Sequence, residues 1–182
     1  MALAITGTGN GSLNNLALSG STGDILDSAN STFFGADWYV MTANHTTNDG
    51  KLTNWQNSLA NSGKIGTGMS ESSGIWTFPN TGVWWIYLTF RIENQAVINS
   101  FSAIEIYTTP DNSTYTQAAR GGTLVDDEGH TTQVTLPFMF DVQDVSNYKF
   151  YFEAQINDAG NYILGSTTNV HTAAGFIRLG DT

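Results

Sequence analysis

Three histidines are the side chains of this chain best suited to proton transfer or metal binding near neutral pH. They are His45, His130 and His171, which lie far apart in polar stretches of the sequence. A catalytic triad requires a nucleophile, a histidine and an orienting acid that converge in space. Neither a G-x-S-x-G nor an H-E-x-x-H motif occurs in the chain. We therefore predict that the histidines lie in loops without a catalytic role and that the protein is not an enzyme.

Two further sets of residues have side chains that suit a ligand. Asp126, Asp127 and Glu128 supply carboxylate oxygens, which Ca²⁺ takes in sets of about six to eight, but they are adjacent instead of spaced as D-x-D-x-D-G. Trp38 and Trp55 are of a type that stacks on sugar rings, although burial in the core is the simpler interpretation of both. The chain has no cysteine, which excludes disulfides, thiol catalysis and thiolate metal sites. We predict no metal and no cofactor.

The charge balance limits the class of partner. The chain has 182 residues, with 16 acidic and 6 basic side chains and a net charge of -10 at pH 7. Binding to nucleic acid or to an anionic membrane requires clustered Lys and Arg, and the basic residues here are scattered. The first residues lack the basic and apolar regions of a secretory signal, and no apolar run approaches the roughly 20 residues of a membrane span. We predict neither nucleic-acid binding, nor membrane binding, nor Sec export.

Composition and periodicity indicate an all-β fold. Charged residues make up 12% of the chain, about half of the usual share of about 25%, and Gly, Ser, Thr and Asn replace them. Residues 82–93 alternate, with Trp84, Ile86 and Leu88 on one face and Trp85 and Tyr87 on the other, as in a strand with one face in the core. Residues 131–140 repeat this pattern. Shorter runs that we also interpret as strands are 75–78, 103–108, 114–119, 148–155, 162–165 and 173–179.

The spacing of these strands favours a double-sheet sandwich. Turn-rich sequences separate the runs, and we interpret residues 51–69 as loop with room for one short strand. Pro137 has no N–H for a ladder, so we expect residues 131–140 to lie at a sheet edge or to contain a bulge. Eight or more antiparallel strands in about 150 residues fit a jelly roll, although periodicity alone does not separate it from other sandwiches.

The N-terminal segment differs from the rest of the chain. Residues 1–31 have no aromatic side chain and two charges, Asp24 and Asp27. We therefore divide the chain into an N-terminal arm or docking segment, residues 1–32, and a jelly-roll domain, residues 33–182. A segment of this composition is either flexible or becomes ordered against a partner. The large apolar side chains that we expect to dock on a partner surface are Leu3, Ile5, Leu13, Leu16, Leu18, Ile25 and Leu26.

Two segments resemble the TNF-like jelly roll, the fold shared by tumour necrosis factor and the globular heads of the first complement component. The first is WTFPNTGVWWIYLTF, residues 76–90, with an aromatic residue, a proline turn, a glycine and alternating apolar residues. The second is AAGFIRL, residues 173–179, which is similar to the closing strand of that family. The resemblance implies a homotrimer whose protomers pack around a threefold axis through an aromatic-rich face.

Three aromatic residues are candidates for this trimer interface. Trp85 and Tyr87 lie opposite the core face of residues 82–93, and Tyr151 lies opposite Phe150 and Phe152. Each sheet of a sandwich has one inner face, so aromatic side chains on the other face need another surface to cover them. We predict that Trp85, Tyr87 and Tyr151 contact neighbouring protomers. The alternative is that loops of the same protomer cover them.

The resemblance and the composition favour a structural virion protein, a trimeric capsid decoration or cement protein of a tailed bacteriophage. It would assemble in the host cytoplasm onto the capsid surface, with itself and the major capsid protein as partners and residues 1–32 docked on the shell. The alternative is the receptor-binding tip of a phage head or tail fibre, which would contact host glycans through loops such as 107–115 and 126–130. We favour decoration because about thirty residues precede the domain, fewer than a fibrous shaft requires.

Overall fold

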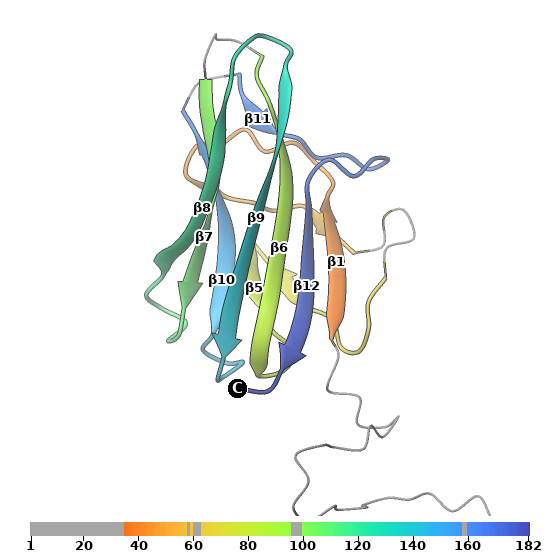
Figure 1. Ribbon diagram of the computed structural model, residues 1–182, viewed down its shortest axis with the longest axis vertical. Coiled ribbons are helices and arrows are strands. Elements are labelled where there is room, and N and C mark those ends of the chain that lie inside the picture. The colour runs from red at the N-terminus through yellow and green to blue at the C-terminus, as the bar shows by residue number, and fades with distance from the viewer. Residues whose placement is uncertain (1–34, 58, 60–62, 96–99, 158–159) are drawn as a thin grey trace, which may run out of the picture. The chain divides into compact units, whose positions relative to one another are not determined.

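The computed structural model describes residues 35–57, 59, 63–95, 100–157 and 160–182. In these residues the chain forms two antiparallel β-sheets that pack face to face (Figure 1). The predicted arm, residues 1–32, and its boundary with the domain lie outside the described residues. No helix in the described part of the chain is long and apolar enough to cross a membrane.

Within the described residues, each sheet has six strands and draws them from both halves of the chain. The strands of sheet A are β1 (Ala36–Met41), β3 (Trp55–Gln56), β6 (Gly82–Glu93), β9 (Thr131–Val142), β11 (Tyr162–Ile163) and β12 (Ala173–Gly180). In this sheet, β6 pairs with β12, β9 and β11, while β1 lies between β12 and β3. The strands of sheet B are β2 (Gly50–Lys51), β4 (Ser70–Ser72), β5 (Ile75–Thr77), β7 (Ser100–Thr109), β8 (Thr116–Val125) and β10 (Lys149–Ile156). The predicted all-β sandwich of two antiparallel sheets is confirmed.

The longest predicted strand has the alternation expected of it. In β6, Trp84, Ile86 and Leu88 are buried, whereas Trp85 is 37% exposed on the opposite face. The partner strand β9 pairs along the whole of β6, and Pro137 stands opposite Tyr87. Strand β9 pairs with no second strand of sheet A among the described residues. The predicted edge position of Pro137 is therefore confirmed.

An aromatic cluster centred on Trp76 joins the two sheets. Trp76 belongs to β5 of sheet B and is fully buried. Its ring lies 4.8 Å, between centroids, from both Tyr39 and Phe176 of sheet A. It stacks on Phe150 of its own sheet at 6.0 Å and meets Phe152 edge-on at 6.1 Å. Such pairs stabilise the fold beyond the area that they bury.

Residues 51–69 are largely loop with one short strand, as predicted. This stretch contains the short strand β3, and Ile65 forms an isolated bridge with Ala36, while Lys51 ends β2. Strand β4 was not predicted at all. Its sequence, Ser-Glu-Ser, has no apolar side chain and lies at the edge of sheet B, beside β5 alone. An edge strand whose two faces are both partly in solvent lacks the alternation of apolar and polar residues by which strands are predicted from sequence.

Replacing Trp76 with alanine should lower the free energy of unfolding by roughly 3–5 kcal/mol, because the substitution leaves a cavity between the two sheets. Urea denaturation followed by circular dichroism measures this loss. The matched control is Leu124→Ala, since Leu124 is 57% exposed and a surface substitution should change stability by about 0.5 kcal/mol or less. Equal losses in the two variants would show that the Trp76 cluster does not hold the sheets together.

Candidate functional site

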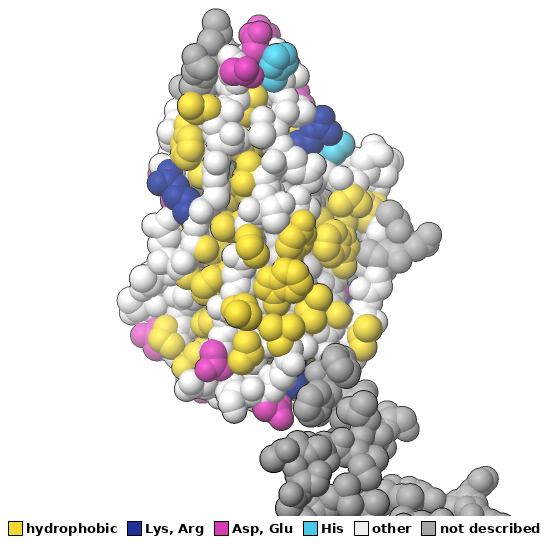
Figure 2. All heavy atoms as spheres, viewed as in Figure 1, with side chains coloured by type: hydrophobic (Ala, Val, Ile, Leu, Met, Phe, Trp, Pro, Cys, Tyr) yellow, Lys and Arg dark blue, Asp and Glu magenta, His cyan; other side chains and the backbone are white. Residues whose placement is uncertain are grey.

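The outer face of sheet A carries a continuous group of apolar side chains, which we call the sheet-A face. Figure 2 shows this group spreading over the lower half of the sheet. Several of these side chains are largely in solvent, with exposed fractions of 62% for Met139, 50% for Leu179 and 40% for Ile177. The sheet-A face consists of Trp38, Trp85, Tyr87, Pro137, Met139, Ile177 and Leu179.

The pairing of four strands brings these residues together. Trp85 of β6 stands opposite Met139 of β9 on one side and Ile177 of β12 on the other. Tyr87 stands opposite Gly175 of β12, and Trp38 of β1 stands opposite the same glycine. Side chains of paired residues point to the same side of a sheet. The register of β6 therefore determines which residues form the face.

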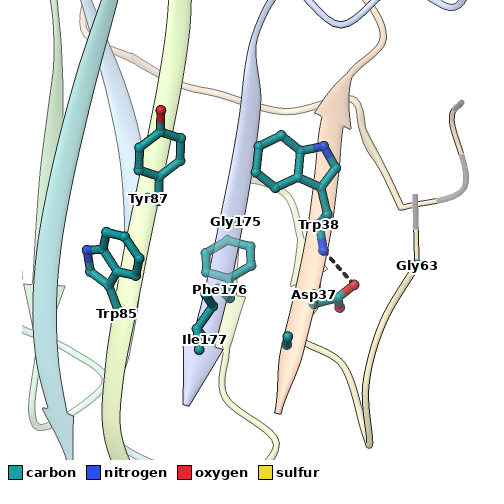
Figure 3. Close-up of a pocket in the computed structure, with 9 residues that line it drawn as sticks. Asp37, Trp38, Gly63, Trp85, Tyr87, Gly175, Phe176 and Ile177 are labelled. Carbon is teal, nitrogen blue, oxygen red and sulfur yellow. Dashed lines mark hydrogen bonds between the residues drawn. The ribbon is translucent and has the colours of Figure 1, made fainter. Parts of the chain in front are cut away.

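Gly175 lets two aromatic rings meet across β12. A Cβ atom added at Gly175 would lie 2.8 Å from two ring atoms of Trp38, closer than real Cβ contacts. Without that atom, Trp38 lies over the strand, and its ring stacks with Tyr87 at 6.5 Å and 25° (Figure 3). Trp85 meets Tyr87 edge-on at 6.0 Å. The three rings lie beside a pocket of about 360 Å³ whose lining also includes Ala36, Gly63 and Ile177.

The centre of the sheet-A face carries no charge. Along the outward positions of β6 and β9, the nearest charged side chains are Arg91 toward one end and Asp141 toward the other. Arg91 donates a hydrogen bond to Thr131 Oγ1 at 2.8 Å. Asp37 of β1 points to the inner side, where its carboxylate accepts hydrogen bonds from the amides of Met69 and Trp38 and where burial raises its pKa. An uncharged apolar surface between two charged ends is typical of the core of a protein interface.

Tyr151 lies on the other sheet and is covered by its own chain. It belongs to β10 of sheet B and is 9% exposed. Its ring stacks on Tyr107 at 5.0 Å and 13°, and Tyr115 lies 4.9 Å away. The Lys51 ammonium lies 4.7 Å from the centroid of the Tyr151 ring. The structure therefore does not bring Tyr151 together with Trp85 and Tyr87, and its need for cover, which motivated the prediction, is met within the protomer.

Charged groups surround this tyrosine cluster. Glu105 forms an ion pair with Arg120 at 3.2 Å and accepts a hydrogen bond from Tyr107 at 2.9 Å. The hydrogen bond to Glu105 raises the pKa of Tyr107 to about 12. Burial, with Asp49 and Glu105 nearby, raises the pKa of Glu153. The outer face of sheet B is thus a hydrogen-bonded polar surface, in contrast to the sheet-A face.

Several residues of the sheet-A face were not predicted from the sequence. Trp38 was interpreted as a core residue, whereas its ring lies on the outer face. Trp55 does pack on the core, 5.6 Å from Trp76. Pro137 and Met139 alternate with the inward residues of β9, so the period of the strand contained the signal for their outward position.

The three histidines have different polar neighbours. His45 Nε2 lies 2.8 Å from the carbonyl oxygen of Thr47, His171 lies 3.5 Å from Arg91, and His130 lies 3.2 Å from the Asp126 carboxylate. Burial lowers the pKa of His45. Within the ranges that the structure describes, no three His, Asp or Glu side chains are grouped so that they would hold a metal ion. The predicted docking residues of the arm, Leu3, Ile5, Leu13, Leu16, Leu18, Ile25 and Leu26, lie outside the described residues.

Comparison with known proteins identifies the fold. No family model matches the chain, and no curated protein matches it. Three crystal structures of murine APRIL, at pH 5.0, 8.0 and 8.5, are similar, with TM-scores of 0.59, 0.58 and 0.57 and sequence identities of 14%, 12% and 13%. Each match covers 80% of this chain and 99% of the other. At this identity the similarity shows the fold alone, which is a TNF-like jelly roll as the sequence predicted.

Neither EDTA nor a thiol reductant should change the melting temperature, because the chain has no cysteine and we expect apolar burial alone to hold the domain. Differential scanning calorimetry with and without each reagent measures this. A fall of several degrees in EDTA alone would contradict the prediction and point to Ca²⁺ at Asp126, Asp127 and Glu128. In that case the variant Asp126→Asn/Asp127→Asn should lose its sensitivity to EDTA.

Proposed function

We propose that this chain is a non-enzymatic assembly protein that forms a homotrimer through the sheet-A face and decorates the capsid of a tailed bacteriophage. The observation that carries the proposal is the uncharged, aromatic sheet-A face on a chain of net charge -10. Large exposed apolar patches on folded proteins mark interaction sites. The TNF-like fold adds to this, since its resemblance implies association around a threefold axis.

Electrostatics favours the sheet-A face over every charged surface as the contact between copies. Two acidic copies repel each other, so they approach at least cost through a surface without acidic groups. The sheet-A face meets this condition and presents Trp, Tyr and Met side chains, which are enriched in interfaces. The outer face of sheet B carries Glu105, Glu153 and Lys51, whose partners lie within the same chain. We therefore place sheet A inside the trimer and sheet B at its surface.

The finer assignment concerns the particle to which the trimer belongs. We propose that it sits on the capsid surface, is assembled in the host cytoplasm and binds the major capsid protein through residues 1–32. The support is compositional: the arm is rich in Gly, Ser and Asn, but apolar side chains such as Leu13, Leu16 and Ile25 punctuate it. A segment of this kind is suited to becoming ordered on another protein. The absence of cysteine and the low share of charged residues also suit a structural component.

A second candidate function, the receptor-binding tip of a phage fibre, is favoured by one observation. Tyr107, Tyr115 and Tyr151 cluster on sheet B beside the loop that joins β7 and β8. Tyr107, with Glu105 and Arg120 beside it, would offer aromatic and hydrogen-bonding groups to a host glycan on the face that the proposed trimer leaves open. Screening the protein against host surface glycans tests this function, and loss of binding in Tyr107→Ala would locate the site.

The protein should be a trimer at micromolar concentration, with three times the chain mass of 19.7 kDa, and Ile177→Asp should dissociate it. The substitution places a charge in the sheet-A face, where burial without a partner is costly. Multi-angle light scattering measures the mass. The matched control is Leu124→Asp, since Leu124 is 57% exposed but belongs to β8 of sheet B. A monomeric parent protein, or dissociation by Leu124→Asp alone, would contradict the proposal.

Deleting residues 1–31 should leave a folded trimer that no longer binds the particle. Ordering such an arm costs about 1–2 kcal/mol per residue, which only an extensive surface on the capsid can offset. Circular dichroism and light scattering verify the fold and the trimer, and electron microscopy of purified particles measures occupancy. Full occupancy by the truncated protein would place the docking surface on the jelly roll. Density at the tail, with none on the shell, would favour the receptor-binding function.

A further inference from the structure

We propose that, in the trimer, Met139 of each copy inserts into the aromatic pocket beside Trp38 and Trp85 of the next copy. The inference rests on the proposed self-association and specifies its central contact. It assigns a protruding side chain and a receiving pocket, both of which lie on the sheet-A face.

Met139 is the protruding residue. Its side chain is 62% exposed, more than any other large hydrophobic side chain among the described residues. It lies on β9, which has β6 on one side and no further strand of sheet A on the other in the described part of the chain. A methionine is unbranched and flexible, and its sulfur makes favourable contacts with aromatic rings. Its position at the sheet edge lets it reach a neighbouring molecule.

The pocket suits such a side chain. It has a volume of about 360 Å³, and Trp38, Trp85, Tyr87 and Ile177 form much of its lining (Figure 3). These residues come from β1, β6 and β12, so the pocket lies on the side of Trp85 away from β9. The polar atoms of Asp37 are occupied by the amides of Met69 and Trp38. The pocket therefore offers aromatic and aliphatic surface to an apolar occupant.

Pairing places the protruding residue and the pocket in one row across the sheet. Met139 stands opposite Trp85, Trp85 opposite Ile177, and Ile177 opposite Ala36 at the pocket. Met139 cannot fill the pocket of its own copy from the far side of Trp85. A rotation that brings the β9 side of one copy onto the β1 side of the next makes a contact between unlike surfaces, which closes into a ring when the rotation fits. No charged side chain stands in this row.

The absence of native cysteine makes a cross-linking test specific. In the variant Met139→Cys/Ala36→Cys, the two positions in one chain are separated by three strand spacings of about 4.8 Å, or about 14 Å, beyond the roughly 7 Å that a disulfide spans between Cα atoms. Under mild oxidation we expect covalent dimers and then covalent trimers on a non-reducing gel, with trimers as the end product. The control Leu124→Cys/Ala36→Cys carries one cysteine on sheet B and should give no such ladder.

A second experiment tests the same contact without introducing cysteine, by measuring the concentration at which the trimer dissociates. Met139→Ala should raise the concentration at which the trimer dissociates at least about tenfold, as expected when a side chain is lost from an interface centre. Leu124→Ala should leave this concentration unchanged. Urea denaturation checks that both variants are folded.

The outcomes separate this inference from the proposed trimer. A parent protein that is trimeric by light scattering, combined with no cross-link in Met139→Cys/Ala36→Cys and no effect of Met139→Ala, would overturn the inference and leave the trimer standing. Cross-linked dimers as the end product, or a ladder that continues beyond three chains, would also overturn it, because the contact would then belong to a twofold or an open assembly. A monomeric parent protein would overturn both.

Discussion

Strand β6 carries large apolar side chains on both of its faces, and the rest of the structure depends on how these two sets are placed. Trp84, Ile86 and Leu88 fill the core, while Trp85 and Tyr87 stand on the opposite side of the same twelve-residue strand. Because side chains alternate with period two, a slip of one residue would exchange the two sets. The register of β6 with β9 and β12 is therefore fixed by the core. The same register then brings Met139 and Ile177 to either side of Trp85.

The two outer faces of the sandwich differ in how far their aromatic side chains are covered by the rest of the chain. On sheet B, Tyr151 is enclosed by Tyr107, Tyr115 and Lys51, and the Tyr107 hydroxyl reaches Glu105. Tyr151 is thus covered within the chain, and the Tyr115 hydroxyl beside it is buried without a hydrogen-bond partner among the described residues. On sheet A, the rings of Trp38, Trp85 and Tyr87 contact one another but leave a pocket and a set of aliphatic side chains in solvent. The aromatic rings on sheet B are therefore covered by neighbours in the same chain, whereas those on sheet A border an open apolar surface.

Strands with strong alternation of apolar and polar residues could be predicted from the sequence. Which residues share an outer face of the sandwich could not. Residues 82–93 and 131–140 were predicted as strands because apolar side chains recur at every second position, and β6 and β9 cover both. Alternation tells whether a side chain points inward or outward, but not to which of two sheets its strand belongs. For that reason Tyr151 was grouped with Trp85, although their strands lie in different sheets. Trp38 was misplaced because Val40 and Met41 are both buried, which breaks the alternation in β1.

The sizes of the outward side chains on β12 explain why the sheet-A face is uneven, with a hollow next to larger side chains. Gly175 has no side chain, so Trp38 settles over the strand and stacks with Tyr87, whereas Ile177, two residues later, rises at the edge of the pocket. A larger residue at position 175 would push the indole outward and remove the contact between the rings. A flat apolar surface allows many relative positions of two molecules, but a hollow beside a protruding side chain allows few. In the proposed trimer, the net charge of -10 would add repulsion between copies, so the shape of the sheet-A face and this repulsion would together favour one mode of association.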